Sequence, residues 1–87
     1  LTISANVQLE PGATQATVKA AFETAVKAYF TEAKTDGAIR ITRVGSILSA
    51  TSGVIDYTNL KLNNAEANVP IASDEYPTLD TVTWVVT

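Results

Sequence analysis

Carboxylates are the only side chains in this sequence whose placement could support catalysis or bind a metal ion. Asp74 and Glu75 are adjacent, and such a pair can transfer protons or supply oxygen ligands to calcium. The segment Asn63–Glu75 adds further amide and carboxylate oxygens, but their spacing does not match an EF-hand loop. We therefore expect a solvated loop here. A small sugar- or metal-binding module that uses the Asn63–Glu75 loop is kept as the alternative function, and an enzyme acting through Asp74 and Glu75 as a third possibility.

Other kinds of catalytic and cofactor site are excluded by the residues that the chain lacks. The 87 residues include no Cys and no His. This rules out a disulfide framework, a thiolate or His-ligated metal site and a Ser-His-Asp triad. Gly45 and Gly53 belong to neither GxGxxG nor GxxxxGK[ST], so no phosphate loop is predicted. We assign no catalytic, cofactor-binding or metal-ligating residue and no cofactor, and we expect a protein that is not an enzyme.

The charge balance argues against nucleic acid and membrane partners. Six Lys and Arg residues stand against nine Asp and Glu residues, which gives a net charge of −3. Arg40, Arg43 and Lys61 are too few for binding driven by phosphate contacts. The longest apolar run is far shorter than the roughly 20 residues of a membrane span, and no signal peptide is visible. From Leu62 to Thr87 there are four acids and no base.

Hydrophobic periodicity predicts the elements that carry these residues. Residues 1–9 alternate apolar and polar side chains, which is typical of a strand with one wet face. After Pro11-Gly12, an apolar stripe at helical spacing predicts a long helix from Gln15 to about Lys34, with Thr14 or Thr17 as N-cap and Gly37 at its end. The stripe consists of Val18, Ala21, Phe22, Ala25, Val26, Tyr29, Phe30 and Ala33.

The second half of the chain predicts one short helix and further strands. Thr42 as N-cap starts a helix over about Arg43–Thr51, which Gly45 weakens by about 1 kcal/mol relative to Ala. Val54–Leu62 is predicted to be a strand bent near Thr58-Asn59, followed by a polar connector over Asn63–Asn68 and a loop over Ser73–Leu79. Short extended pieces are expected at Ala38–Ile41 and Asn68–Ala72, and a last strand at Asp80–Thr87, with Val82, Trp84 and Val86 on one face and Thr81, Thr83, Val85 and Thr87 on the other.

Together these elements predict one α+β domain over residues 1–87. Its fold class is a two-layer sandwich with two helices packed on one face of a three- to four-stranded mixed or antiparallel sheet. Trp84 is expected in the core. The other faces of the first and last strands are uncharged, and such faces and edges pair readily with other chains. The chain opens without Met inside a strand pattern, so we expect a domain of a longer protein or a processed product.

Several short motifs resemble the C-terminal region of the baseplate J-like family. The family pattern places a Gly-Val pair after two helices, then a Leu-x-Leu-Asn segment, an Asn-Ile-x-Leu segment and a Glu-x-Pro-x-Leu-Gly segment followed by Val. The corresponding residues here are Gly53–Tyr57, Leu60–Asn63, Asn68–Ile71 and Asp74–Leu79, preceded by Pro11–Thr14 with Val18 and by Ile39–Val44. The resemblance covers essentially the whole chain. Asp80 stands where the family often has Gly.

This resemblance implies a structural protein rather than an enzyme. Baseplate J-like proteins are wedge components of contractile phage tails, including those of Mu-like phages and of PBSX-like prophages. The resemblance implies that this chain is the C-terminal domain of a longer baseplate protein and that it docks onto other baseplate and tail proteins. The isolated domain is expected to be a monomer that joins a ring in the parent assembly. The implied location is the virion tail baseplate, or a phage-like particle, assembled in the bacterial host cytoplasm.

Overall fold

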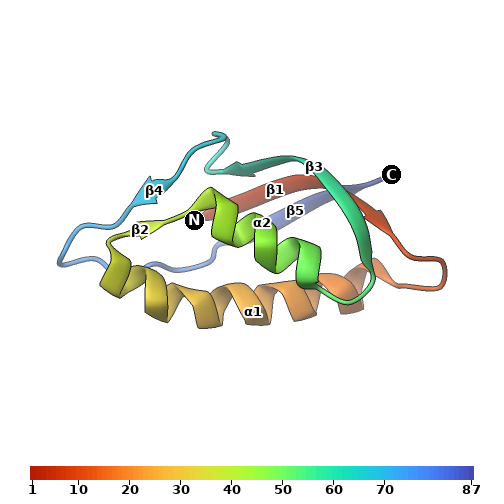
Figure 1. Ribbon diagram of the computed structural model, residues 1–87, viewed down its shortest axis with the longest axis horizontal. Coiled ribbons are helices and arrows are strands. Elements are labelled where there is room, and N and C mark those ends of the chain that lie inside the picture. Colours follow the sequence, from red (N-terminus) through yellow and green to blue (C-terminus); the bar gives the residue numbers. More distant parts are fainter.

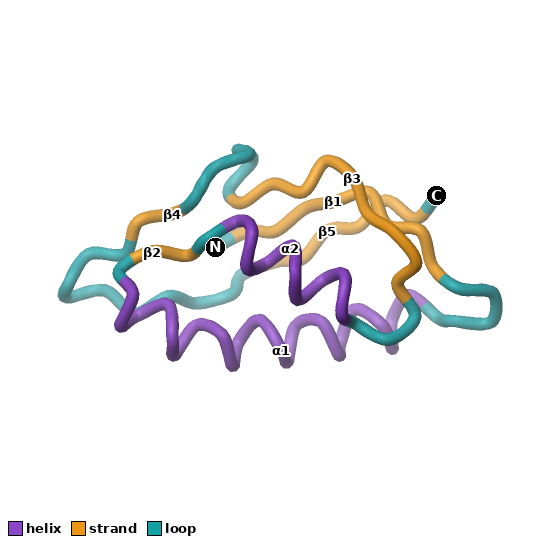
Figure 2. Tube along the Cα trace, in the orientation of Figure 1, coloured by secondary structure: helices purple, strands orange, loops and turns teal.

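The computed structural model describes residues 1–87 and places two helices on one face of a three-stranded sheet (Figure 1). Figure 2 shows the strands on one side of the molecule and the helices on the other. The predicted fold class is thus confirmed. The elements in chain order are β1 (Thr2–Leu9), α1 (Gln15–Asp36), β2 (Ala38–Ile39), α2 (Ile41–Ala50), β3 (Val54–Leu62), β4 (Val69–Pro70) and β5 (Thr81–Val86).

The sheet is mixed, with β1 at its centre and the order β3-β1-β5. β1 pairs antiparallel with β3 and parallel with β5, and β2 and β4 form a separate two-stranded antiparallel ladder. The bend predicted near Thr58-Asn59 is present, because Asn59 has a φ of 55° and the β1–β3 register shifts there. The alternation of β1 buries Ile3, Ala5 and Val7 against the helices.

The long helix α1 forms because its apolar residues recur at helical spacing and Gly37 ends it. Gly37 has a φ of 88°, and its N–H donates to the Ala33 carbonyl. It is thus the left-handed residue that the sequence predicts at the end of this helix. Thr14 occupies the N-cap position, but its hydroxyl lies 2.9 Å from the Thr17 hydroxyl and caps no backbone N–H. The predicted stripe is too wide, since Ala21 and Ala25 are exposed. They lie on the side of α1 facing α2, where small side chains leave a shallow hollow.

The second helix begins two residues earlier than the sequence predicts, and Thr42 is not its N-cap. Arg40 takes the N-cap position, and its carbonyl accepts hydrogen bonds from the Arg43 and Val44 N–H groups. The Ile41 N–H donates to Asn68 Oδ1 at 2.9 Å. An acceptor from a distant loop therefore replaces the local cap that sequence reasoning expects at Thr42.

The core lies between the helices and the inner face of the sheet, where Phe22 and Trp84 rings meet at a centroid distance of 5.6 Å. Trp84 is buried as predicted, and its indole N–H has no hydrogen-bond partner. Val86 shares that strand face but is 44% exposed, because it is the last residue of β5. The prediction that Val86 faces the core alongside Val82 is therefore only partly right.

Two glycines fit places where a side chain would not. Gly53 has a φ of 97°, and a Cβ there would lie 2.7 Å from Val18 Cγ2. Gly45 faces the Tyr57 ring. The glycine that lowers the helix propensity of α2 is therefore also the residue that lets α2 and β3 approach closely.

A tight turn closes β3. Asn63 and Asn64 both have positive φ, at 51° and 65°, which is the conformation of a type I′ turn. Asn63 also exchanges hydrogen bonds with Thr2: its N–H donates to the Thr2 carbonyl and its Oδ1 accepts the Thr2 N–H, each at 2.8 Å. These asparagines act as turn residues at the start of the predicted polar connector.

Candidate functional site

The outer face of the sheet is uncovered and almost free of charge. On β1 and β5 the pairs Thr2–Thr81, Ser4–Thr83 and Asn6–Val85 lie side by side on this face. Val85 is 58% exposed. Asn59 and Lys61 of β3 complete a shallow hollow across the three strands. This face has the uncharged, β-branched character predicted for it, and nothing else in the chain covers it.

The two edges of the sheet differ in how well they are protected against pairing. The edge strand β3 carries a bulge at Asn59 and the charged residues Asp56 and Lys61, features that oppose edge-to-edge association. The edge strand β5 contains no charged residue and no Pro, and its ladder with β1 is regular throughout. Val85 and Val86 are both exposed near its end. β5 is therefore the edge at which another chain would meet least resistance.

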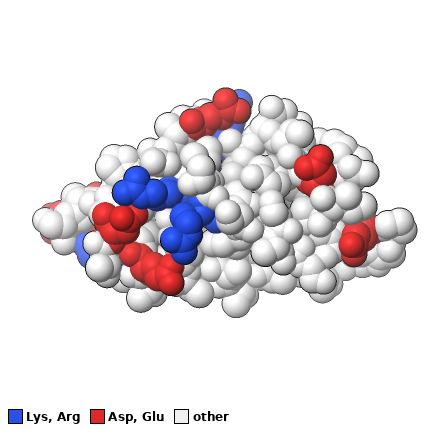
Figure 3. Space-filling model, viewed as in Figure 1, with Lys and Arg blue, Asp and Glu red and all other residues white.

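A salt-bridge cluster occupies the other end of the molecule, where α1 ends and α2 begins (Figure 3). Arg40 Nε lies 2.8 Å from Asp36 Oδ2, and Arg43 Nη2 lies 2.9 Å from Glu32 Oε2. The hydrogen bond from Arg40 holds the pKa of Asp36 below its ordinary value, and the same bond raises the pKa of Arg40. Because acids of α1 pair with both arginines, Arg40, Arg43 and Lys61 do not form a free basic patch.

The loop between β4 and β5 is held by Lys34 of α1. The Lys34 ammonium donates to the carbonyls of Ala72 at 3.4 Å and Ser73 at 2.9 Å, and also to the Glu75 carbonyl. Glu75 Oε1 in turn accepts the Ala72 N–H at 2.9 Å. This loop is thus ordered by a side chain that sequence reasoning did not single out. No spacing pattern could have identified it, since Lys34 lies 38 to 41 residues from these partners.

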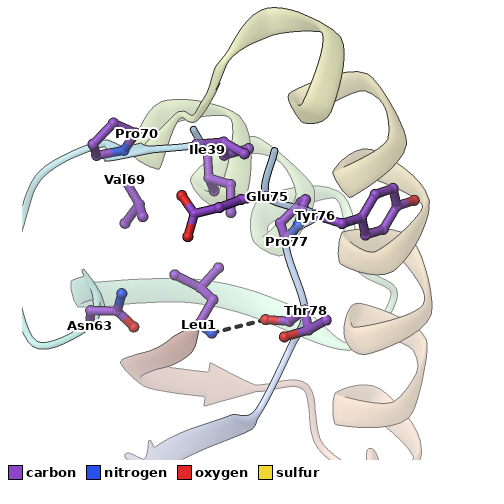
Figure 4. A pocket seen from close by; sticks show the side chains of 10 residues that line it. Leu1, Ile39, Asn63, Val69, Pro70, Glu75, Tyr76, Pro77 and Thr78 are labelled. Carbon is purple, nitrogen blue, oxygen red and sulfur yellow. Dashed lines mark hydrogen bonds between the residues drawn. The ribbon is translucent and has the colours of Figure 1, made fainter. Parts of the chain in front are cut away.

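A pocket of about 220 Å³ opens between this loop, the small β2–β4 ladder and the start of β1 (Figure 4). Apolar side chains supply half of its ten lining residues, and the Glu75 carboxylate is turned into it. The Tyr76 ring points away from the pocket over α1, where its hydroxyl lies 3.5 Å from Thr31 Oγ1. The lining residues are Leu1, Ile39, Asn63, Val69, Pro70, Ile71, Glu75, Tyr76, Pro77 and Thr78.

The structure does not bring the predicted carboxylates together as a metal or catalytic centre. Asp74 and Glu75 are both exposed, and only Glu75 lines the pocket. No three acids lie close enough to share a metal ion. The Asn63–Glu75 loop does form one wall of a pocket, but that pocket contains a single carboxylate. Of the two helices, neither combines the length and the hydrophobicity that a membrane span requires.

Comparison with known protein families identifies a match. A family model described as the baseplate J-like protein C-terminal domain matches residues 1–85, nearly the whole chain. A search of curated proteins finds no match. The family match agrees with the motifs quoted above and with the α+β fold. The chain therefore belongs to the baseplate J-like protein C-terminal domain family, whose members have a structural role in phage tail baseplates.

Proposed function

We propose that this chain is a wedge component of the baseplate of a contractile phage tail or phage-like particle, where it acts as a protein–protein docking module. The observation that carries the proposal is the family match over residues 1–85. In this proposal the chain is the C-terminal domain of a longer baseplate protein. Its partners are neighbouring baseplate and tail proteins in a ring, and the particle assembles in the cytoplasm of a bacterial host.

The outer face of the sheet and the β5 edge support a docking role. Both are exposed and rich in β-branched side chains. The β5 edge is uncharged, and the charges of the outer face, Asp56 and Lys61, lie on β3, whose edge also carries a bulge. Main-chain groups of an unprotected edge strand can pair with an extended segment of another chain, and the adjacent side chains then add contact area. We therefore place the docking surface at Thr83, Val85 and Val86.

A role without catalysis is consistent with the rest of the molecule. The acids do not form a cluster, and the pocket beside the Asn63–Glu75 loop holds one carboxylate. Its volume of about 220 Å³ is below the roughly 300–1,000 Å³ of pockets that bind drug-sized ligands, which is too small for a sugar chain. These observations favour docking over the sugar- or metal-binding alternative.

The experiment places Thr83→Lys and Val85→Lys together in the full-length parent protein. Two lysines on the outer sheet face should prevent a partner from docking, because a buried ammonium without a partner is costly. The expected result is a strong loss of assembled tail particles, counted by electron microscopy. Ala28→Lys and Thr24→Lys on the exposed side of α1 are the matched control and add the same charge. Circular dichroism of the isolated domain checks that each variant folds. Normal particle numbers with a folded double variant would refute this docking surface.

A further inference from the structure

The pocket beside the 72–75 loop contains an unpaired negative charge. Glu75 Oε1 accepts the Ala72 N–H, and Glu75 takes part in none of the three salt bridges of the chain. Leu1 also lines the pocket, and its main-chain nitrogen donates to the Thr78 carbonyl. The Glu75 carboxylate therefore faces the pocket with Oε2 unbonded and outside every salt bridge of the chain. The Lys34 ammonium beside it is bound to main-chain carbonyls, that of Glu75 among them.

The backbone around this carboxylate is fixed rather than free to turn away. Lys34 binds three carbonyls of the loop, including that of Glu75. Oε1 of Glu75 accepts a hydrogen bond from the N–H of Ala72, three residues earlier, and this bond fixes the direction of the side chain. Figure 4 shows the carboxylate between Ile39 and Val69 on one side and Leu1 and Asn63 on the other. A carboxylate whose direction is already fixed loses less conformational freedom on binding a cation than a mobile surface charge does.

We propose that this pocket receives a lysine side chain of a partner protein. Leu1, Ile39 and Val69 offer apolar contacts to the four-carbon stem, and Glu75 suits the ammonium group at its end. The volume of about 220 Å³ corresponds to about seven water molecules at ~30 Å³ each, which fits one long side chain and its hydration. An arginine fits less well, because the bidentate contact that favours guanidinium needs both carboxylate oxygens and one already binds Ala72.

The surrounding charge supports a basic partner. Residues 62–87 contain four acids and no base, and Asp74 and Asp80 flank the Glu75 loop in sequence. Such a surface attracts a basic segment and repels an acidic one. That the lysine belongs to another protein rests on the proposed docking function, whereas the preference of the pocket for an alkylammonium group rests on its own geometry.

The test uses n-butylammonium chloride as the probe and 1-butanol as its neutral counterpart, each titrated into the isolated chain at constant ionic strength. Amide chemical shifts in ¹H–¹⁵N NMR spectra report binding at Val69 and Tyr76. We expect saturable shifts with butylammonium, and at least threefold weaker binding of butanol. Equal affinity for the two probes, or no saturable shift with either, would overturn the proposal.

Variants separate the charge from the fold. Glu75→Gln keeps an oxygen that can accept the Ala72 N–H but removes the charge, so that butylammonium binding should weaken at least threefold. Asp74→Asn removes the same charge one residue away, outside the pocket, and should bind as the unmodified chain does. Val69→Phe fills the pocket and should abolish binding of both probes with Glu75 intact. Binding that survives Val69→Phe, or is equally weakened by Asp74→Asn, would show that the shifts report surface charge and not this pocket.

Failure of this proposal can be told apart from failure of the docking function. The pocket lies at the β2–β4 end of the molecule, whereas the proposed docking surface is the outer face of β5. If butylammonium does not bind while Thr83→Lys and Val85→Lys still abolish particle assembly, the lysine pocket is refuted and the docking function stands.

Discussion

Gly45 is the position where helix propensity and tertiary packing predict opposite effects of one substitution. Propensity alone predicts that Gly45→Ala stabilises α2 by about 1 kcal/mol, because Gly is a poor residue in a helix interior. The structure predicts destabilisation. A methyl group at Gly45 would overlap the Tyr57 hydroxyl and lie 3.3 Å from Tyr57 Cζ and 3.5 Å from Leu60 Cδ2.

The size of the effect follows from what must move. Tyr57 is half-buried and its hydroxyl makes no hydrogen bond within the chain, so the ring can shift, but only by disturbing the packing between α2 and β3. Overpacking of this kind costs about 1–3 kcal/mol. With the propensity gain of about 1 kcal/mol set against it, Gly45→Ala should lower the free energy of unfolding by up to about 2 kcal/mol.

A double-mutant cycle isolates the contact. Tyr57→Phe removes the overlapping oxygen, so in that background Gly45→Ala should stabilise the domain by up to about 1 kcal/mol, the propensity gain. The coupling energy between the two positions should equal the overpacking cost of about 1–3 kcal/mol. The assay is urea unfolding followed by Trp84 fluorescence, with equal m-values required for the comparison.

The control and the refuting result use the same assay. Ser46→Ala changes an exposed neighbour in α2 and should alter stability by no more than a few tenths of a kcal/mol. If Gly45→Ala stabilises the domain by about 1 kcal/mol both in the unmodified chain and in the Tyr57→Phe variant, propensity alone governs the site. The packing of Tyr57 over Gly45 described here would then be wrong.

Three other predictions follow from single contacts. Phe22→Ala removes the ring that packs on Trp84 and should lower the free energy of unfolding by about 3–5 kcal/mol in the same assay, whereas a loss below about 1 kcal/mol would contradict its central place in the core. Lys34→Met should leave global stability nearly unchanged but speed amide hydrogen exchange in the 72–75 loop, and unchanged exchange would show that the ammonium does not order it. The pKa of Asp36 is lowered in the folded state. Its carboxylate therefore stabilises the fold at pH values above its ordinary pKa of 3.8, and this contribution is lost as the pH falls through the lowered pKa. In Arg40→Gln, NMR titration should show the Asp36 midpoint moving up toward the ordinary value, and an unchanged midpoint would refute the assigned cause.

Much of the fold could be predicted because local patterns and tertiary structure agree. The alternation of β1, the apolar stripe of α1 and the position of Gly37 each express one physical requirement within a few residues. The bend at Asn59 was visible because the alternation fails there. For these elements, neighbours in the sequence determine which face is buried.

The errors arise where a distant residue takes part. The start of α2 depends on Asn68 Oδ1, which lies 27 residues from the Ile41 N–H that it accepts. The exposure of Ala25 depends on how α2 crosses α1, and periodicity along one helix does not contain that information. The order β3-β1-β5, with β5 parallel to β1, likewise results from packing between segments.

The chemical character of the candidate site could be predicted from the sequence, but the directions of its side chains could not. The uncharged strand faces could be recognised from Thr81, Thr83 and Val85, and the structure shows them exposed on one face. The acids of the Asn63–Glu75 loop suggested metal chemistry, yet the fold turns only the Glu75 side chain into a pocket. A carboxylate pair in sequence says little about a site until the backbone sets the direction of each side chain.

The central claim is that this domain docks in a tail baseplate through the outer face of its sheet. The most direct test is a cryo-electron microscopy reconstruction of particles purified from the strain that encodes the chain. We predict density for this domain in the baseplate, with another chain contacting Thr83 and Val85. A baseplate that contains the domain with this face open to solvent, or particles that lack the domain, would contradict the claim.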